Sequence, residues 1–328
     1  SLIFAGMSGS ALADIGGIGR IEIDAMRSKG FNPAFAGAVT ASSALVGPIF
    51  PPSIPLIIYG TVTGVSVIQL LLGGILPGLL CIAMLMLMTG WLAVRRKYPR
   101  AARWPAFAEL WRDFWPAFPA ILAPLILIAG MLAGFFTPTE IAAVTVAYTL
   151  LISSLFYRDL TWRGLTDAAY ETIRASASIL LIVAVAAIFG WILSVEQVPQ
   201  TLTGWMLSVS TNPTVLLFLV NVLLLVVGMF LDSTTAILVV APIIAKPLIA
   251  AGVDPVHLGM VVVFNLMIGL LTPPMGLALF LVADIARVPM KNILTEMMPF
   301  YIPLGITLLL ITYVPELTTW IPRLALSP

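Results

Sequence analysis

Residues 47–53 read GPIFPPS, and residues 269–275 read GLLTPPM. In both stretches a glycine is followed four residues later by a Pro-Pro pair, and both lie inside long apolar segments. Proline lacks a backbone N–H donor, and its ring clashes with the preceding turn of a helix. The two stretches therefore predict two membrane helices that are each interrupted near the middle, and we interpret the interruptions as the functional part of the chain.

The composition is that of an integral membrane protein. The 328 residues are 60% hydrophobic and only 9% charged, whereas soluble domains carry roughly 25% charged residues. A soluble core cannot hide that much apolar surface. The net charge of +1 argues against a nucleic-acid partner. The single cysteine, Cys81, excludes an internal disulfide, and the single histidine, His257, disfavours histidine-based catalysis and metal binding.

The apolar segments predict an all-α protein with several membrane spans. A spanning helix needs about 20 apolar residues. The expected spans are 34–60, 68–93, 117–135, 138–157, 170–195, 255–283 and 296–314. Two further stretches, 1–24 and 213–250, each contain a polar or glycine-rich interruption. The segment 102–115, ARWPAFAELWRDFW, suits a helix on the membrane surface, with a plain cytoplasmic loop as the alternative.

Glycine and proline recur at a fixed spacing of 222 residues. The matched pairs are Gly6 and Gly228, Met7 and Met229, Gly30 and Gly252, Pro33 and Pro255, Gly37 and Gly259, Gly47 and Gly269, Pro51 and Pro273, Pro52 and Pro274, and Pro77 and Pro299. No gap is needed along this register, so we interpret it as an internal repeat rather than shared composition. Repeats within a membrane protein are typical of transporters.

The basic residues predict the orientation of the chain. Cytoplasmic loops carry an excess of Lys and Arg. Four loops hold 14 of the 16 basic residues, and only Lys246 and Arg323 lie elsewhere. All four loops can be cytoplasmic only if the two interrupted stretches are re-entrant hairpins. Five spans then separate Pro33 from Pro255, and because five is odd the two repeats are inverted, as in secondary transporters.

We therefore expect five parts along the chain. These are a first transport part with a hairpin and a broken helix (1–66), a span with a surface helix (67–116), scaffold helices (117–200), a second transport part (201–290), and a C-terminal span with a periplasmic tail (291–328).

Each broken helix and its hairpin tip predict one cation site. Prolines free backbone carbonyls, which are costly in lipid unless protein or a bound group satisfies them. The tips SGSALAD (8–14) and LDSTTA (231–236) add hydroxyl and carboxylate oxygens. The first predicted site is Ser8, Ser10, Gly47, Phe50 and Pro52, and the second is Gly228, Asp232, Gly269, Thr272 and Pro274, with Phe50 and Pro52 acting through carbonyls.

The substrate is expected between the two tips. Helix N-termini after the tips favour an anion. The predicted residues are Ser10, Ser53, Ser233, Thr234 and Thr235. Hydroxyl groups in membrane helices also bond to the preceding turn, so that alternative stays open for each of them.

Several polar residues have a structural interpretation. Asp232 is expected to cap a helix as well as to line the site. Asp14 and Asp284 are expected near membrane ends, Glu140 in a first-turn cap, and His257 at the interface.

At this point the sequence resembles a known family. GMSGSALAD, GPIFPPSIPLIIYG, FFTPTEIAAV, GMFLDSTTAILVVAPI and IGLLTPPMGLALF are similar to segments of the large membrane subunit, DctM-like, of tripartite ATP-independent periplasmic (TRAP) transporters. The resemblance covers about residues 1–320, and it is the combination of motifs that makes it specific.

The resemblance implies an elevator mechanism in a bacterial inner membrane. It implies Na⁺, with at least two sites, as the ion that drives uptake of an organic anion such as a C4-dicarboxylate or sialic acid. It also implies two partners, a periplasmic substrate-binding protein (DctP-like) and a small membrane subunit (DctQ-like).

Three other classes were weighed. An intramembrane protease would need a base beside a serine, or an aspartate pair such as Asp14 with Asp232, and no motif supports either. A channel would not need inverted hairpins. A single-component dicarboxylate symporter, coupled to Na⁺ or H⁺, needs no binding protein and stays as the alternative. Because the second repeat begins near residue 117, we expect the chain to lack about 105 residues of the first repeat, and so to be truncated at its N-terminus.

Overall fold

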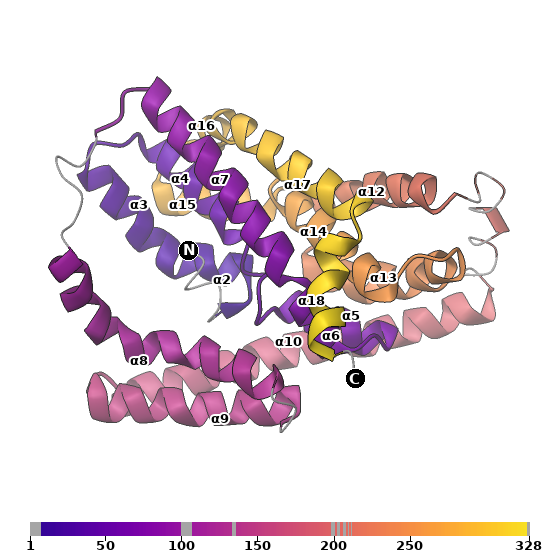
Figure 1. The fold of residues 1–328 in the computed structure, drawn as a ribbon, viewed down its shortest axis with the longest axis horizontal. Coiled ribbons are helices and arrows are strands. Elements are labelled where there is room, and N and C mark those ends of the chain that lie inside the picture. Colours follow the sequence, from indigo (N-terminus) through magenta and orange to yellow (C-terminus); the bar gives the residue numbers. More distant parts are fainter. Residues whose placement is uncertain are drawn as a thin grey trace. The chain divides into compact units, whose positions relative to one another are not determined.

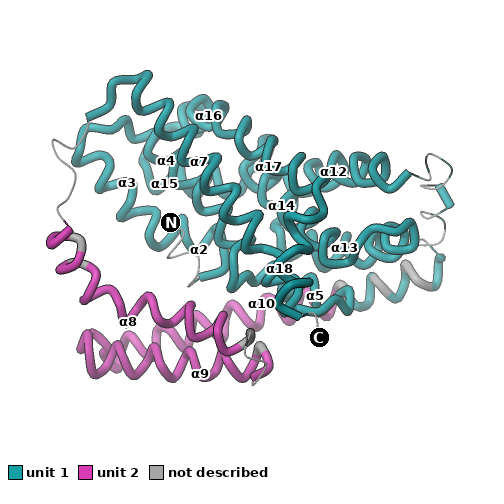
Figure 2. Tube along the Cα trace, in the orientation of Figure 1, with its two compact units in different colours: residues 1–99, 186–328 teal, residues 100–185 magenta. Residues whose placement is uncertain are grey.

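The computed structural model describes residues 8–99, 107–132, 136–197, 201, 204–205, 208, 210 and 212–326. Within these ranges every regular element is helical, as the composition predicts. The chain forms two compact units, one of residues 1–99 with 186–328 and one of residues 100–185 (Figure 2). This division differs from the expected five parts, because the span after the first broken helix and the C-terminal helices group with the hairpins.

Six helices of the described part are long and apolar enough to cross a membrane. They are Val67–Arg95, Thr139–Phe156, Trp162–Phe189, Pro213–Phe230, Ser233–Ala250 and Met290–Tyr313. The expected spans 34–60 and 255–283 are absent from this set because each is divided into two shorter helices. Gly6 and Met7, which begin the sequence repeat, lie outside the described residues.

The first half of the larger unit contains six helices. They are α2 (Ala11–Gly16), α3 (Ile18–Ser28), α4 (Pro33–Ala44), α5 (Ile54–Thr63), α6 (Val67–Gly73) and α7 (Ile75–Arg95). Local chemistry sets where they begin: Asn32 caps α4, and Pro33 follows it at a position where a missing N–H costs nothing. The interval from α4 to α5 is the first break.

The second half repeats this order. It contains α12 (Pro213–Phe230), α13 (Ser233–Ala250), α14 (Pro255–Leu270), α15 (Leu277–Ala286), α16 (Met290–Met297), a 3₁₀ turn (Met298–Phe300), α17 (Tyr301–Tyr313) and α18 (Glu316–Leu326). The interval from α14 to α15 is the second break. Both breaks occur at the Pro-Pro pairs, as the sequence predicts.

The helix starts follow the spacing of the sequence repeat. Ser10 caps α2 and Asp232 caps α13, 222 residues later. Asn32 caps α4 and Asp254 caps α14, again 222 residues apart. The polar side chain at each position accepts a hydrogen bond from the first turn of its helix, so the repeat is visible in capping chemistry as well as in glycine and proline.

The core of the larger unit is built around α14, from which nearly every side chain is buried. The helix α12 packs along α14, α13 packs against α5, and α15 packs against α2 and α4 (Figure 1). Each hairpin arm therefore contacts the broken helix of the other half of the chain.

The smaller unit contains α8 (Phe107–Leu132), α9 (Pro138–Leu151) with a π-helical turn (Ile152–Phe156), and most of α10 (Trp162–Val195). The Tyr148 hydroxyl donates to the Pro119 carbonyl at 2.8 Å and joins α9 to α8. Thr137 and Glu140 form a reciprocal cap at the start of α9, which confirms the structural interpretation of Glu140.

The expected surface helix at 102–115 is not a separate helix. Residues 107–115 form the first turns of α8, which continues to Leu132 despite three internal prolines, and residues 102–106 lie outside the described part. An amphipathic pattern next to an apolar one does not by itself create a boundary, because the backbone hydrogen bonds can continue through both.

Candidate functional site

The first break is a compact turn whose far end is held by Ser53. The Ser53 side chain is fully buried and caps α5 by accepting from the Leu56 N–H at 3.2 Å. The same hydroxyl donates to the Pro48 carbonyl inside the break. The Pro51–Pro52 bond is cis, and Gly47 is buried. One hydroxyl thus joins the turn to the helix that follows it.

The first hairpin tip lies directly against this break. The Ile54 N–H donates to the Gly9 carbonyl at 3.3 Å. Gly9 has φ +61°, and a Cβ placed on it would lie 2.6 Å from the Pro52 carbonyl oxygen. The structure therefore brings together Ser8 and Ser10, which flank Gly9, with Pro52, as the sequence predicts for one site.

The hydroxyl groups of the first tip also serve local structure. The Ser10 side chain caps α2 by accepting from the Ala13 N–H at 3.5 Å. The Ser8 hydroxyl donates to the Asp14 carboxylate, and its oxygen accepts from the Ser10 N–H at 3.2 Å. Asp14 was expected near a membrane end with a structural role, and the structure adds that it orients Ser8.

The second break is held mainly by backbone hydrogen bonds and Thr272. The Thr272 N–H donates to the Gly269 carbonyl at 2.8 Å, and its hydroxyl donates to the Ile268 carbonyl at 2.7 Å. The Tyr301 hydroxyl from α17 donates to the Leu271 carbonyl. Pro274 is exposed, and the Pro273–Pro274 bond is cis.

The second hairpin tip meets the second broken helix through glycines. A Cβ on Gly228, near the end of α12, would lie 3.1 Å from the Gly269 Cα. Beyond the tip, the Asp232 carboxylate caps α13 by accepting from the Thr234 N–H at 3.0 Å. Among the described residues, no hydrogen bond joins Asp232 to Thr272 or Pro274, so its side chain is a cap in this arrangement.

Unpaired carbonyls are the shared property of the two sites. The carbonyls of Gly47, Phe50 and Pro52 in the first site accept no hydrogen bond from any described residue. The same is true of Gly228, Thr272 and Pro274 in the second, whereas the Gly269 carbonyl is engaged by Thr272. Unpaired carbonyls are rare in buried backbone. This donor set fits a monovalent hard cation, which transporters hold through unwound carbonyls.

The expected substrate residues differ in exposure. Thr234 and Thr235 are half-buried at the start of α13, and Ser10 is half-buried at the first tip. Ser233 is buried at 7% exposure, and Ser53 is fully buried. In this arrangement Ser53 supports the site from inside the protein, while the threonines lie closer to the surface.

A buried polar cluster escaped the sequence interpretation. The Asn265 amide donates to the Asn221 Oδ1 at 2.7 Å, and the Asn221 amide donates to the Thr312 hydroxyl at 2.9 Å. His257, expected at the interface, is buried instead, with its ring nitrogens 3.0 Å from the Thr318 hydroxyl and 3.2 Å from the Thr312 carbonyl. Two asparagines within apolar runs were a usable signal, because polar residues at membrane depth have partners.

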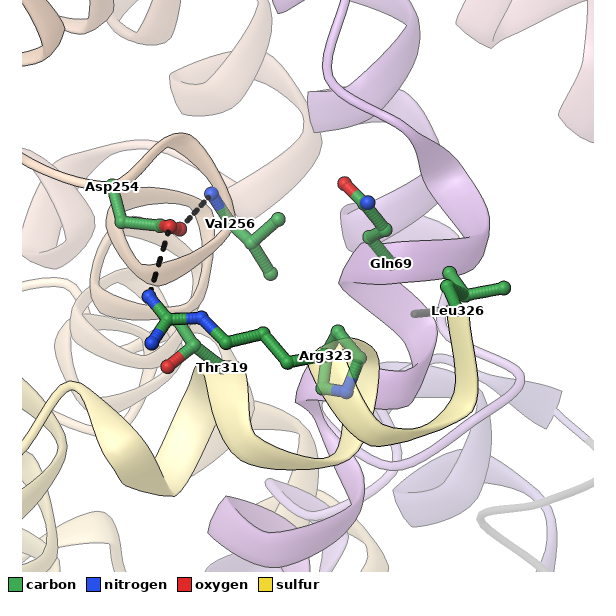
Figure 3. Close-up of a pocket in the computed structure, with 7 residues that line it drawn as sticks. Gln69, Asp254, Val256, Thr319, Arg323 and Leu326 are labelled. Atoms are coloured by element: carbon green, nitrogen blue, oxygen red, sulfur yellow. Dashed lines mark hydrogen bonds and ion pairs between the residues drawn. The ribbon is translucent and has the colours of Figure 1, made fainter. Parts of the chain in front are cut away.

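A small pocket lies at the other end of α14 (Figure 3). It measures about 290 Å³ and is lined by α6, α14 and α18. The Asp254 carboxylate accepts from the Val256 N–H at 2.9 Å and lies 3.8 Å from the Arg323 guanidinium. The pocket is separated from the second break by the length of α14, roughly 24 Å at 1.5 Å per residue, so it is no part of the site at the breaks.

Comparison with known proteins relates these features to one family. The family described as "Tripartite ATP-independent periplasmic transporter, DctM component" matches residues 1–317. The sialic acid TRAP transporter large permease protein SiaM of Vibrio cholerae is 43% identical over 330 residues, covering 100% of this chain and 76% of the relative.

Two further relatives carry related names. The sialic acid TRAP transporter permease protein SiaT of Haemophilus influenzae is 38% identical over 324 residues, covering 99% of this chain and 52% of the relative. The C4-dicarboxylate TRAP transporter large permease protein DctM of Vibrio cholerae is 33% identical over 347 residues, covering 100% of this chain and 76% of the relative.

Proposed function

The chain belongs to the DctM component family of tripartite ATP-independent periplasmic transporters, and from this premise we propose that it imports an organic acid anion with Na⁺ as the coupling ion. The observation that carries the proposal is the match to large permease subunits along nearly the whole chain. The chain is a transporter subunit and not an enzyme, and its apolar helices make it a multi-pass protein of the bacterial inner membrane.

The substrate is an organic anion of the kind that relatives are named for. Those names include sialic acid, C4-dicarboxylates and 2,3-diketo-L-gulonate, all of which carry a carboxylate. Hydroxyl groups and helix N-termini at the tips supply hydrogen-bond donors for such a group. A periplasmic binding protein delivers the anion, and a small membrane subunit completes the permease.

Two Na⁺ sites lie at the breaks. The first uses the carbonyls of Gly47, Phe50 and Pro52 with the hydroxyls of Ser8 and Ser10. The second uses the carbonyls of Gly228, Thr272 and Pro274, with Gly269 and the Asp232 carboxylate beside them. The support for both sites is the set of carbonyls that no described residue satisfies. The bound ion supplies positive charge next to the anion, so the two are taken up together.

The two halves are inverted repeats that move together as an elevator. The support is the 222-residue spacing of the caps, together with the exchanged packing of α13 on α5 and of α2 on α15. This exchange ties both tips and both breaks into one body, which is the property that a moving transport domain requires.

Uptake into proteoliposomes tests the whole proposal. The intact subunit and its small partner are reconstituted, and radiolabelled sialic acid, C4-dicarboxylates and keto acids are offered with and without an inward Na⁺ gradient and the binding protein. Uptake of one of these anions that requires both is the expected result. Uptake with Na⁺ alone identifies a single-component symporter, and uptake indifferent to Na⁺ overturns the cation sites.

A matched pair of threonine variants tests the second site. The Thr272 hydroxyl donates to a carbonyl one turn back at 2.7 Å, and the exposed Thr61 hydroxyl does the same at 2.8 Å. Thr272→Val should raise the Na⁺ concentration that gives half-maximal uptake, because it removes an oxygen beside the site. Thr61→Val loses the same kind of hydrogen bond away from the site and should leave this concentration unchanged.

A further inference from the structure

A groove of about 920 Å³ lies between α7 and the segment formed by the 3₁₀ turn and α17. Its walls are almost entirely apolar and include Leu87, Trp91, Ile302 and Ile306. Leu87 is 70% exposed and Ile302 is 59% exposed, so the groove is open on its outer side. Its volume is within the range of pockets that bind small molecules.

Methionines make the floor of this groove adaptable. Met84 and Met88 from α7 face it, and Met298 adds a third thioether from the 3₁₀ turn. Methionine is unbranched and flexible, and it fills against irregular partners better than branched side chains do. Such a surface suits a flexible hydrocarbon chain.

One end of the groove carries two arginines with different environments. Arg96 is paired with Glu296 and lies over the Phe35 ring at 5.4 Å. Arg95 is exposed and lies over the Trp91 ring at 5.0 Å, and no described residue forms an ion pair with it. The groove therefore ends at one guanidinium whose charge is not neutralised within the described protein.

The position of this end along α7 places it at a membrane surface. Arg95 is the last residue of a span, and Arg96 and Lys97 follow it, in one of the basic loops that the charge distribution assigns to the cytoplasm. Trp and Arg at the end of a span lie at the level of the lipid headgroups. The apolar part of the groove then lies at the depth of the acyl chains.

We propose that this groove is a binding site for an anionic phospholipid. The phosphate lies at the Arg95 guanidinium beside Trp91, and an acyl chain follows the groove between α7 and α17. Basic pockets between membrane helices on the cytoplasmic side bind anionic headgroups. The charge favours a lipid over a helix from another protein, because an apolar helix would leave the Arg95 charge without a counter-ion.

Binding of defined lipids to the purified intact complex tests the site. Native mass spectrometry counts phosphatidylglycerol and phosphatidylcholine retained after exchange into detergent with either lipid. The wild type should retain phosphatidylglycerol in preference. Arg95→Gln should weaken this retention about fivefold, since a basic residue near the surface contributes ~1 kcal/mol. Arg95→Lys keeps the charge and should restore most of it.

Blocking the apolar part gives a second, independent variant. Ile302→Trp fills the groove and should reduce retention of both lipids. The matched controls are Arg163→Gln, which removes an exposed arginine elsewhere, and Leu79→Trp, which adds the same ring on α7 outside the groove. Both controls should bind lipid as the wild type does.

Three results would overturn the proposal. The first is equal retention of both lipids by the wild type. The second is equal retention of phosphatidylglycerol by Arg95→Gln and Arg163→Gln. The third comes from a phosphatidylglycerol with a photoreactive acyl chain: it should crosslink to peptides containing Met298 or Ile302, and capture of a protein subunit by a photoreactive residue at position 302 instead assigns the groove to a protein partner.

Discussion

Gly269 lies against Gly228 so closely that a Cβ on Gly269 would be 2.6 Å from the Gly228 Cα. The atoms it would meet belong to the backbone of α12, which cannot move aside as a flexible side chain can. The second hairpin and the second broken helix are thus joined where both carry a predicted cation ligand. Tight contact here and unpaired carbonyls nearby belong to the same local geometry.

Gly269→Ala should therefore destabilise the protein and impair uptake. Overpacking of a well-packed contact costs about 1–3 kcal/mol. Thermal unfolding in detergent and Na⁺-dependent uptake both report on it. The matched control is Gly305→Ala in α17, where a Cβ meets nothing within 4 Å. That control should be neutral or slightly stabilising, because alanine favours helix, and equal effects of the two variants would contradict the argument.

Gly9→Ala should abolish the close approach of the first tip to the first break. It adds a clash 2.6 Å from the Pro52 carbonyl to the strain of a positive φ, which costs roughly 1–2 kcal/mol for a residue with a Cβ. Gly64→Ala isolates the strain, because Gly64 has φ +76° and open space around it. We expect the Na⁺ dependence of uptake to change for Gly9→Ala and to be retained for Gly64→Ala.

The asparagine pair should show strong non-additivity. Asn265→Leu removes the donor to Asn221 and leaves a buried acceptor unpaired, which costs about 1–3 kcal/mol. Asn221→Leu should be similarly costly. The double variant should be less destabilised than the sum of the two, because it removes both partners. A double-mutant cycle on the free energy of unfolding measures this, and simple addition would show that the pair is not coupled.

Ser53→Ala should destabilise more than the comparable change at Ser66. Both serines cap a helix, with Ser66 accepting from the Gln69 N–H at 3.5 Å. Ser53 is buried and also donates to Pro48, whereas Ser66 is exposed. Losing a cap costs about 1 kcal/mol, and leaving a buried carbonyl unpaired adds about 1–3 kcal/mol. Unfolding temperatures that fall equally would place the Ser53–Pro48 bond outside the stability of the break.

Elements with strong local signals were predictable. The expected span 68–93 corresponds to Val67–Arg95, and the two Pro-Pro pairs lie where the helices stop. Asp232 was expected to cap a helix, and it does. These features depend on the length of apolar runs, on missing N–H groups and on side chains that reach their own helix. All of these forces act within a few residues along the chain.

Features that need two distant segments were less accessible. His257 was expected at the interface and is buried, because α18 supplies Thr318 as its partner from 61 positions along the chain. The boundary expected before residue 117 was wrong, because the helix α8 continues through it. Neither outcome is written in local composition.

The sequence by itself determined the membrane class, the breaks and the residues that face one another across the repeat, because hydrophobicity and proline chemistry are local properties. The tertiary structure alone decided which carbonyls remain unpaired, that Gly9 touches Pro52, and that Gly228 touches Gly269. Those relationships depend on where whole helices pack. Helix packing is set by the summed fit of many side chains, which no single motif encodes.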